Sequence, residues 1–332
     1  MPAFDQLFDG ATLASSVAHP GGMMKGFTLL QHNVSSVSAL VFITLISVPF
    51  SVQGQNAPRP AAGWSGVEQI LGKKGSVNAG GGVKFGFPRS DLLVRLDNVT
   101  IKPALALGGW VAFKGNPNGQ STVMGDLVLL ENEATPVMRA LQAGGVEQTA
   151  VHNHLLREQP HVIYMHIHAR GNSQAIARTI RNALGQTKTP FAASPSPAAA
   201  PPSDLDTVAI ASTLRVAGKW NGGVYQVSVP RRETITDDGM EVPPSMGVAT
   251  GINFQPTGGG KAAITGDFVL RAGEVNPVIR ALGANGIEVT ALHTHMLTEQ
   301  PKLFFMHFWA NSDAVKLARG LGAALDKTAS KR

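Results

Sequence analysis

Two short stretches of this chain are rich in histidine. The first, at 149–170, reads TAVHNHLLREQPHVIYMHIHAR and holds five of the ten histidines in 332 residues. The second, at 290–311, holds three more. Imidazole nitrogens and carboxylate oxygens are common protein ligands of first-row divalent metals. Because the chain has no cysteine, a metal ion here would be held by histidine, carboxylate, methionine or backbone groups.

The spacing of the first histidines predicts that they share one face of a β-hairpin. Side chains two residues apart in a strand point to the same face, so His152 and His154 lie together. A turn centred near Gln159 places His152 opposite His166 on the second strand. Glu158 has the same parity and lies at the turn. We therefore expect three imidazoles and one carboxylate to converge within reach of a metal ion.

The second stretch repeats this set position for position. It carries His293, His295, Glu299 and His307, whereas Lys302 and Trp309 replace His161 and His168. His161 is therefore expected to be incidental and His168 at most an auxiliary ligand. The sequence predicts two equivalent sites for a divalent transition metal (Zn, Cu, Mn or Fe), with the ligands His152, His154, Glu158 and His166 in one and His293, His295, Glu299 and His307 in the other.

A structural role is the alternative for the same residues. Histidines on a sheet face can be buried, neutral and hydrogen-bonded to one another, to Glu158 or to Asp126 on a neighbouring strand. Asp126 and Asp267 each follow a glycine at equivalent positions. For these two aspartates we expect a β-bulge or a hydrogen bond in preference to metal ligation.

The histidine stretches belong to a longer internal repeat. The segment starting GDLVLLENEATPVMRAL at Gly125 aligns without a gap on GDFVLRAGEVNPVIRAL at Gly266, an offset of 141 residues (266 minus 125). The similarity continues upstream with small gaps. We expect two copies of one unit, at 64–187 and 204–328, joined by a Pro/Ala/Ser-rich linker at 188–203.

The pattern within each unit predicts an α+β fold. Helices are expected at 65–71, 133–145 and 173–184 and, in the second copy, at 204–214, with Ser65 and Asp204 as possible caps. Strands are expected at 83–87 and 224–229, followed by hairpins over the GWVAF and STVMGDLVLL segments and over the histidine stretch. We predict two tandem copies, each a mainly antiparallel sheet with helices packed on one face.

Composition places the chain among folded proteins and argues against nucleic-acid binding. Hydrophobic residues make up 43% and charged residues 15% of the chain, and its formal net charge is +6. Lysine and arginine occur singly or in pairs, with no long basic run. We therefore expect a metal ion or small ligand as the partner and no nucleic acid. The sequence leaves the oligomeric state open.

The N-terminal 54 residues are predicted to be an extension plus a signal peptide. Lys25 precedes an apolar run at 37–54 that ends in small residues, and Val52 and Gly54 suit the positions before a cleavage site. Residues 1–22 do not look like the start of a signal, so translation is expected to begin at Met23 or Met24. The protein is then exported to the periplasm or the extracellular space, and it contacts the membrane only if the segment stays uncleaved.

Several motifs resemble the LppY/LpqO family of exported bacterial proteins. They are PRSDL at 88–92, GDLVL at 125–129, PVMRAL at 136–141, and HNHLLREQP with the later MHIH. The resemblance implies an exported two-copy protein and supplies no established reaction. Some members look like lipoproteins, but this chain lacks the cysteine needed for such an anchor, which favours a soluble form.

These observations support one principal hypothesis and two alternatives. The principal hypothesis is an exported, non-catalytic metal-binding protein with two sites. The first alternative is a metalloenzyme with an open metal position, in which Glu158 and Glu299 act as general bases. The second alternative is a structural or partner-binding envelope protein whose histidines are buried.

Overall fold

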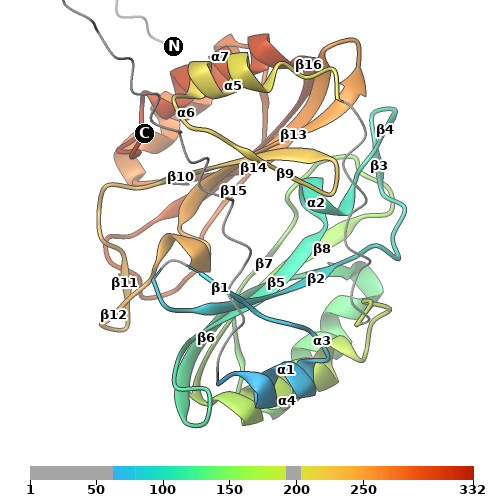
Figure 1. Ribbon diagram of the computed structural model, residues 1–332, viewed down its shortest axis with the longest axis vertical. Coiled ribbons are helices and arrows are strands. Elements are labelled where there is room, and N and C mark those ends of the chain that lie inside the picture. Colours follow the sequence, from blue (N-terminus) through green and yellow to red (C-terminus); the bar gives the residue numbers. More distant parts are fainter. Residues whose placement is uncertain (1–62, 79, 192–202) are drawn as a thin grey trace, which may run out of the picture. The chain divides into compact units, whose positions relative to one another are not determined.

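The computed structural model describes residues 63–78, 80–191 and 203–332 (Figure 1). The predicted signal segment at 1–54 and most of the predicted linker at 188–203 lie outside the described residues. No helix in the described part of the chain is both long and apolar enough to cross a membrane. Both repeats lie within one compact unit, Gln55–Arg332.

The first repeat forms a six-stranded antiparallel sheet with the strand order β1-β2-β5-β6-β8-β7. Its elements are, in chain order, α1 (Ser65–Leu71), β1 (Ser76–Val77), β2 (Val83–Pro88), β3 (Arg95–Leu96), β4 (Val99–Thr100), α2 (Pro103–Ala106), β5 (Gly108–Gly115), β6 (Gln120–Leu130), α3 (Glu131–Ala143), β7 (Glu147–His152), β8 (Val162–Asn172) and α4 (Ser173–Leu184).

The second repeat forms a sheet with the equivalent strand order β9-β10-β13-β14-β16-β15. Its elements are α5 (Thr207–Leu214), β9 (Lys219–Asn221), β10 (Val224–Pro230), β11 (Thr236–Asp237), β12 (Met240–Glu241), the 3-10 turn η1 (Pro244–Met246), β13 (Ala249–Gly258), β14 (Lys261–Leu270), α6 (Ala272–Ala284), β15 (Glu288–His293), β16 (Phe304–Asp313) and α7 (Ala314–Leu325).

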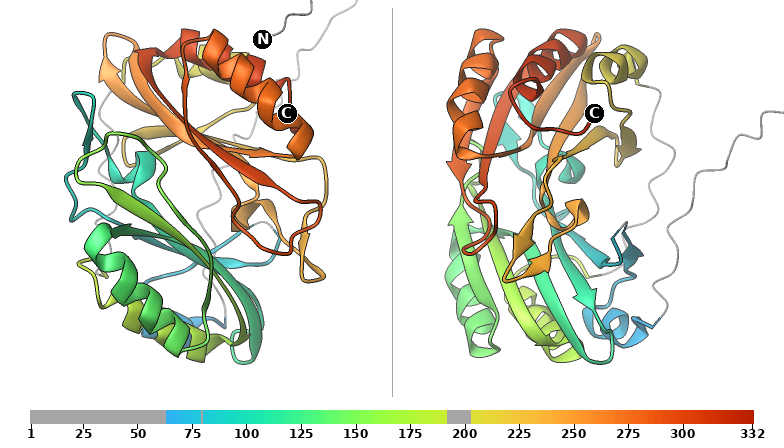
Figure 2. Two further views of the ribbon diagram at one scale, coloured as in Figure 1. Left: turned by 180° about the vertical axis from the view of Figure 1, so that it is seen from behind. Right: turned by 90° about the vertical axis from the view of Figure 1, so that its left-hand side faces the viewer.

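The predicted fold class is confirmed. Each repeat is a six-stranded antiparallel sheet whose longer helices pack on one face, while the short helix α2 lies between the two sheets (Figures 1 and 2). The helix predicted at 173–184 is α4, and the one predicted at 204–214 starts later, at Thr207. Asp206 caps α5 by accepting a hydrogen bond from Ala209, whereas Asp204 accepts one from the Gly260 amide at 2.8 Å. At α1 the N-cap is Trp64, without a side-chain cap.

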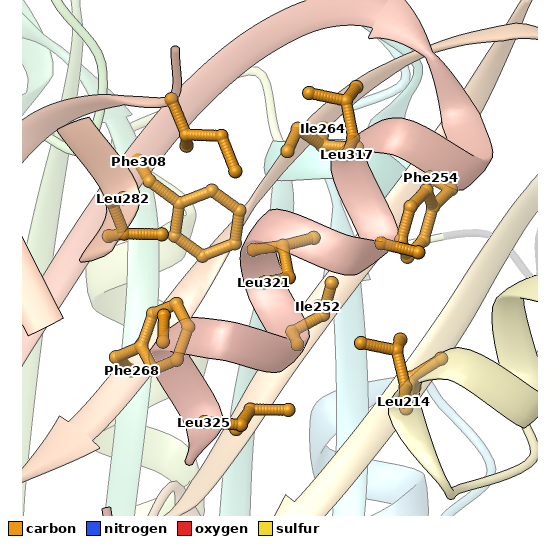
Figure 3. Packing of buried hydrophobic residues seen from close by; sticks show 14 of the residues in the cluster. Leu214, Ile252, Phe254, Ile264, Phe268, Leu282, Phe308, Leu317, Leu321 and Leu325 are labelled. Atoms are coloured by element: carbon orange, nitrogen blue, oxygen red, sulfur yellow. The ribbon is translucent and has the colours of Figure 1, made fainter. Parts of the chain in front are cut away.

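Alternation along the strands sends one set of side chains toward the helices. In β6, Val123, Leu127 and Leu129 are buried with residues of α1, α3 and α4. The second repeat has the same kind of core (Figure 3), formed by residues of α5, α6 and α7 with Ile252, Phe254, Ile264, Phe268 and Phe308. Each repeat therefore has its own apolar core on the helical face of its sheet.

The other face of each sheet carries residues that pack against the opposite repeat. In β6 the intervening residues Met124 and Val128 belong to two further apolar clusters, and each cluster combines residues of both repeats. The β3–β4 hairpin contacts the second repeat, since Trp309 Nε1 donates to Asp97 at 2.8 Å. The β11–β12 hairpin contacts the first, since Arg170 donates to the Asp237 carbonyl at 3.1 Å. The two repeats thus bury these faces against each other.

A buried arginine ties the end of a strand to the start of a helix in each repeat. Arg89, 1% exposed, donates from Nη1 to the Val128 carbonyl at 2.9 Å and to Glu133 at 2.6 Å. Glu133 also accepts from the Leu130 amide at the start of α3. Arg231 makes the equivalent contacts in the second repeat, with Val269 and Glu274. The Pro-Arg pairs that end β2 and β10 are therefore structural.

We predict that Arg89→Ala destabilises the protein by about 3–5 kcal/mol, because it leaves the Glu133 carboxylate buried without its cation. Urea unfolding followed by circular dichroism measures this change. Arg139→Ala, on the exposed face of α3, is the matched control and should leave the unfolding midpoint unchanged. Equal effects of the two substitutions would contradict the anchoring role of Arg89.

Candidate metal centre

The histidine hairpin forms as predicted, with a different register. Residues 150–152 of β7 pair with β8 so that Ala150 lies opposite His166 and His152 lies opposite Tyr164. The turn is therefore centred one residue earlier than predicted, and the shared face is unchanged. Because β7 ends at His152, His154 lies in the loop that follows. Met165 points to the helical face and joins the first core.

The structure brings the two predicted histidine sets together into one cluster. His152 stacks on His293, with ring centroids 3.5 Å apart. His154 stacks on His307 at 3.6 Å, and His166 stacks on His295 at 3.7 Å. Each stacked pair takes one ring from each repeat. The two histidine sets, for which we expected separate sites, therefore lie together in one composite cluster between the two sheets.

Backbone carbonyls determine which ring nitrogens face the cluster. Nδ1 of His307 lies 2.7 Å from the Gly266 carbonyl, and Nδ1 of His293 lies 3.3 Å from the Thr294 carbonyl. Nδ1 of His152 lies 3.3 Å from the Asn153 carbonyl. A carbonyl can only accept, so Nδ1 carries the proton in each neutral ring and Nε2 keeps its lone pair. Metal-ligating histidines are oriented in this way by their surroundings.

Four groups of donor atoms are compact enough to hold an ion. Within each group, one ligand atom per residue lies within 4.8 Å of all the others. Two groups consist of four histidines and share His152 and His293, and the other two combine an aspartate with two histidines. The groups are His152, His166, His293 and His295; His152, His154, His293 and His307; Asp126, His154 and His166; and Asp267, His295 and His307. The repeat relates the groups of each kind to each other.

Most of the inward-facing atoms have no protein partner. Among the described residues, Nε2 of His152, His154, His166 and His295 is buried without a hydrogen bond, as is Oδ1 of both Asp126 and Asp267. Nε2 of His307 lies 2.8 Å from Nε2 of His293. This contact is a hydrogen bond when one of the two rings carries its proton on Nε2. Buried polar atoms are normally satisfied, and a cation would satisfy these.

Burial keeps the histidines neutral. Burial, together with the neighbouring His293, lowers the pKa of His152 to about 3. Burial lowers the pKa of His293 to about 4. The pKa values of His154, His166, His295 and His307 also lie well below their usual range, first because of burial and then because of the other histidines. Neutral imidazole is the form that binds a metal ion.

Burial also acts on the two aspartates of the cluster. It raises the pKa of Asp126 to about 8, against the opposing effect of the Lys84 ammonium. It raises the pKa of Asp267 well above its usual range, and Asp126 adds to the shift. Burial thus disfavours the ionised form of each carboxyl group. A divalent cation would favour its ionised form.

The two predicted glutamates lie outside the four groups. The Glu158 carboxylate is 1% exposed and accepts from the Val162 amide at 3.4 Å. Glu299 accepts from the Leu303 amide at 3.1 Å and from Lys302 at 3.2 Å. The reason is the course of the loop: Gln159 and Gln300 pair through their backbones with β3 and β11, so the chain leaves the strand register that the parity argument assumed.

Asp126 and Asp267, for which we expected a bulge or a hydrogen bond, are the carboxylates that belong to metal-capable groups. Asp126 pairs directly with His166 across β6 and β8, without a bulge at that point. The nearest approaches of the two carboxylates to the histidines, 4.0 Å for Asp126 to His166 and 3.5 Å for Asp267 to His295, are ion-pair separations without a hydrogen bond. The sequence offered one signal for this role: in neighbouring strands, Asp126 pairs with His166 and Asp267 with His307, which places each aspartate on the same sheet face as its histidine.

The two remaining histidines of the first stretch lie apart from the cluster. His161 is exposed, and its Nδ1 is 4.0 Å from Glu158. His168 lies farther along β8, where Nε2 is 3.8 Å from Asp237 and Nδ1 is 3.9 Å from Glu147. Neither residue belongs to a metal-capable group among the described residues.

Reciprocal hydrogen bonds fix the two loop histidines across the repeats. Thr149 donates from Oγ1 to the carbonyl of His295 at 2.5 Å. Thr290, its counterpart, donates to the carbonyl of His154 at 2.6 Å. Each repeat thereby positions a candidate ligand of the other.

Comparisons with known proteins identify the repeats. Segments 65–186 and 208–327 match the family model described as Domain of Unknown Function (DUF1259). No curated protein matches the chain. The crystal structure of EtuB from Clostridium kluyveri is 13% identical, covers 76% of this chain and 90% of its own, and has a TM-score of 0.18. The crystal structure of the trimeric bacterial microcompartment shell protein PduB is 14% identical, covers 75% of this chain and 88% of its own, and has a TM-score of 0.17. Likeness at these TM-scores supports no conclusion about fold or function.

We predict that Thr149→Val combined with Thr290→Val lowers the free energy of unfolding by about 1–3 kcal/mol, because two carbonyls at the centre lose their donors. Chemical denaturation of the double variant measures the loss. Thr149→Ser with Thr290→Ser keeps both hydroxyl groups and should recover most of the stability. A valine variant as stable as the unsubstituted protein would contradict the positioning role of these bonds.

Proposed function

We propose that this chain, which belongs to the family described as Domain of Unknown Function (DUF1259), binds divalent transition-metal ions at the composite histidine cluster. The ligands are drawn from the six histidines and from Asp126 and Asp267. Neutral imidazoles with carboxylates suit Zn, Cu, Mn or Fe. Under this proposal both repeats contribute ligands to the same cluster.

One observation supports the proposal above the others: four of the six inward-facing Nε2 atoms of the cluster are buried without a hydrogen-bond partner in the described part of the chain. A structural network of neutral histidines would pair each donor with an acceptor. Here three Nδ1 atoms donate outward to carbonyls, and among the described residues four Nε2 atoms have no hydrogen-bond partner. A cation at the centre satisfies acceptors of this kind, whereas packing alone leaves them desolvated.

The donor count supports two ions per chain. His152 and His293 belong to both four-histidine groups, and one Nε2 atom bonds one ion. The six histidines therefore divide into two sets of three. Three histidines per ion match the protein ligands of the His₃ zinc sites. Each aspartate groups with one histidine from each four-histidine group, Asp126 with His154 and His166 and Asp267 with His295 and His307, so both carboxylates lie beside both ions.

Export is part of the proposal and rests on the sequence. The apolar run at 37–54 after Lys25 supports a secretory signal, and the motifs shared with the LppY/LpqO family support an envelope or extracellular location. A metal centre without thiolates is compatible with an oxidising compartment, since it contains no cysteine that could be oxidised.

A metalloenzyme is the second candidate, and a cavity that reaches the cluster favours it. His154 and His307 are among the residues that line a cavity of about 790 Å³. An ion with an open position beside such a space can activate water or polarise a substrate. The general bases expected for this alternative, Glu158 and Glu299, are not among the described residues that line the cavity, and their carboxylates accept hydrogen bonds from loop amides.

Metal content is the direct test. Protein saturated with zinc should retain about two ions per chain after gel filtration, measured by inductively coupled plasma mass spectrometry. His152→Ala with His293→Ala removes the ligands shared by both four-histidine groups and should reduce the content to near zero. His161→Ala, at an exposed position, is the control and should match the unsubstituted protein.

A stability measurement provides a second readout of the same proposal. Zinc at one hundred times its dissociation constant should raise the free energy of unfolding by about 2.7 kcal/mol. Protein that retains no metal and whose unfolding midpoint does not respond to Zn, Cu, Mn or Fe would refute the metal-binding function.

The two candidate carboxylate pairs can be distinguished by matched amide substitutions. Asp126→Asn with Asp267→Asn should weaken zinc binding about tenfold or more, because each ion loses a charged ligand. Glu158→Gln with Glu299→Gln keeps the loop hydrogen-bond acceptors and should leave the dissociation constant within about twofold. Isothermal titration calorimetry measures both variants. The reverse order of effects would restore the glutamates as ligands.

A further inference from the structure

The repeat relates the two halves of the cluster, but their surroundings differ. One half is marked by the stacked pair His166 and His295, and the other by the pair His154 and His307. A cavity of only about 10 Å³ adjoins the first pair, whereas the cavity of about 790 Å³ adjoins the second. About 10–15 Å³ is the least space that holds one water molecule, so only the second half has room for an organic ligand.

Large side chains close the half that contains His166 and His295. The small cavity there is lined by Trp110 and by the three methionines Met124, Met246 and Met296. Met124, Met246 and Met296 are at most 5% exposed and belong to one apolar cluster. This side is sealed by packed thioether and indole groups.

Smaller residues stand at the equivalent positions on the other half. Trp110 pairs with Asp126 on the neighbouring strand, and Gly251 pairs with Asp267 in the same way. Two residues before each aspartate, Met124 in the first repeat corresponds to Thr265 in the second. Both Gly251 and Thr265 line the large cavity, and a Cβ atom added at Gly251 meets nothing within 4 Å. The cavity therefore exists where glycine and threonine replace tryptophan and methionine.

The large cavity reaches solvent and carries one cationic side chain other than histidine. Its rim residues Ser90, Gly108 and Asn221 are exposed. Among the described residues that line it, Lys84 is the single lysine or arginine, and its Nζ lies 3.8 Å from the centroid of the Trp110 ring. The remaining surface is largely apolar, with Pro88 and the α2 residues Pro103, Ala104, Leu105 and Ala106.

These features together specify a ligand. An ion bound by three of these histidines keeps a position for a further ligand, as zinc sites with three protein ligands do. At the open half, this further ligand would enter from a cavity that has a cation on one wall and apolar residues on another. Such walls suit a molecule with an anionic oxygen at one end and an apolar body at the other.

We infer that the metal ion beside His154 and His307 binds a small organic carboxylate from the large cavity, with Lys84 contacting the carboxylate, while the ion beside His166 and His295 is sealed and structural. This inference rests on the proposed metal-binding function. It assigns different roles to two halves that the repeat makes equivalent in ligands. Open metal positions are typical of catalytic sites, and closed ones are typical of structural sites.

Cobalt-loaded protein tests the inference, with benzoate as the probe. The visible spectrum of Co²⁺ reports a change of ligand at the ion, and metal content is measured on the same samples. We expect a saturable change with one benzoate bound per chain, although about two cobalt ions are present. A response from both ions in equal measure would overturn the assignment of one sealed half.

Two variants place the probe in the large cavity. Gly251→Trp copies the first repeat into the second and should abolish the benzoate response with unchanged cobalt content. Lys84→Gln introduces the residue found at the equivalent position of the second repeat, Gln226. It should weaken benzoate binding about tenfold. Benzoate binding that is unaffected by Gly251→Trp, or no spectral change in fully cobalt-loaded protein, would overturn the inference and leave the metal-binding proposal intact.

Inorganic phosphate tests the ligand class. It should perturb the cobalt spectrum more weakly than benzoate at equal concentration, because it makes no use of the apolar wall. Phosphate binding that is tighter than benzoate binding would overturn the assignment to organic carboxylates. Protein that binds no cobalt at all would instead refute the proposed function itself.

Discussion

The structure depends on one costly arrangement: eight polar side chains, three of them buried and five half-buried, lie between two sheets, and most of their inward-facing atoms have no hydrogen-bond partner among the described residues. Removing such groups from water is unfavourable unless each finds a partner. The surroundings reinforce the arrangement, since backbone carbonyls hold the imidazole protons outside and apolar clusters that combine both repeats pack beside it. A divalent cation is the partner that would offset this cost, and its binding energy would then stabilise the contact between the repeats.

This dependence explains why the chain carries the repeat twice. A single copy contributes three histidines and one aspartate, but each stacked pair needs a ring from the other copy. The threonine bonds that position His154 and His295 also cross between the copies. A single repeat would expose the histidine face of its sheet to water, where the imidazoles would be hydrated and less organised. The centre is therefore a property of the pair.

Sequence reasoning recovered what depends on local periodicity and missed what depends on loops and docking. The period of two along β7 and β8 placed His152 and His166 on one face, whatever the exact register, and His154 joins them from the loop after β7. Parity fails once a chain leaves its strand, and Glu158 lies in a loop that turns aside to pair with β3. The sequence could not predict that the histidines of the two repeats stack on one another. Similarity between two segments does not indicate which faces they bury against each other.

The same reasoning shows where duplication leaves room for divergence. Ligands on the shared face are constrained in both copies, because each serves a centre that the copies hold in common. Residues one strand away, such as Trp110 and Gly251, are constrained only by local packing, and they can differ without disturbing the ligands. A large side chain at one such position fills the space beside the histidines, and a glycine at the other leaves it open. A cavity can thus reach one half of a symmetric set of histidines and not the other. This difference requires changes only in the residues around the histidines.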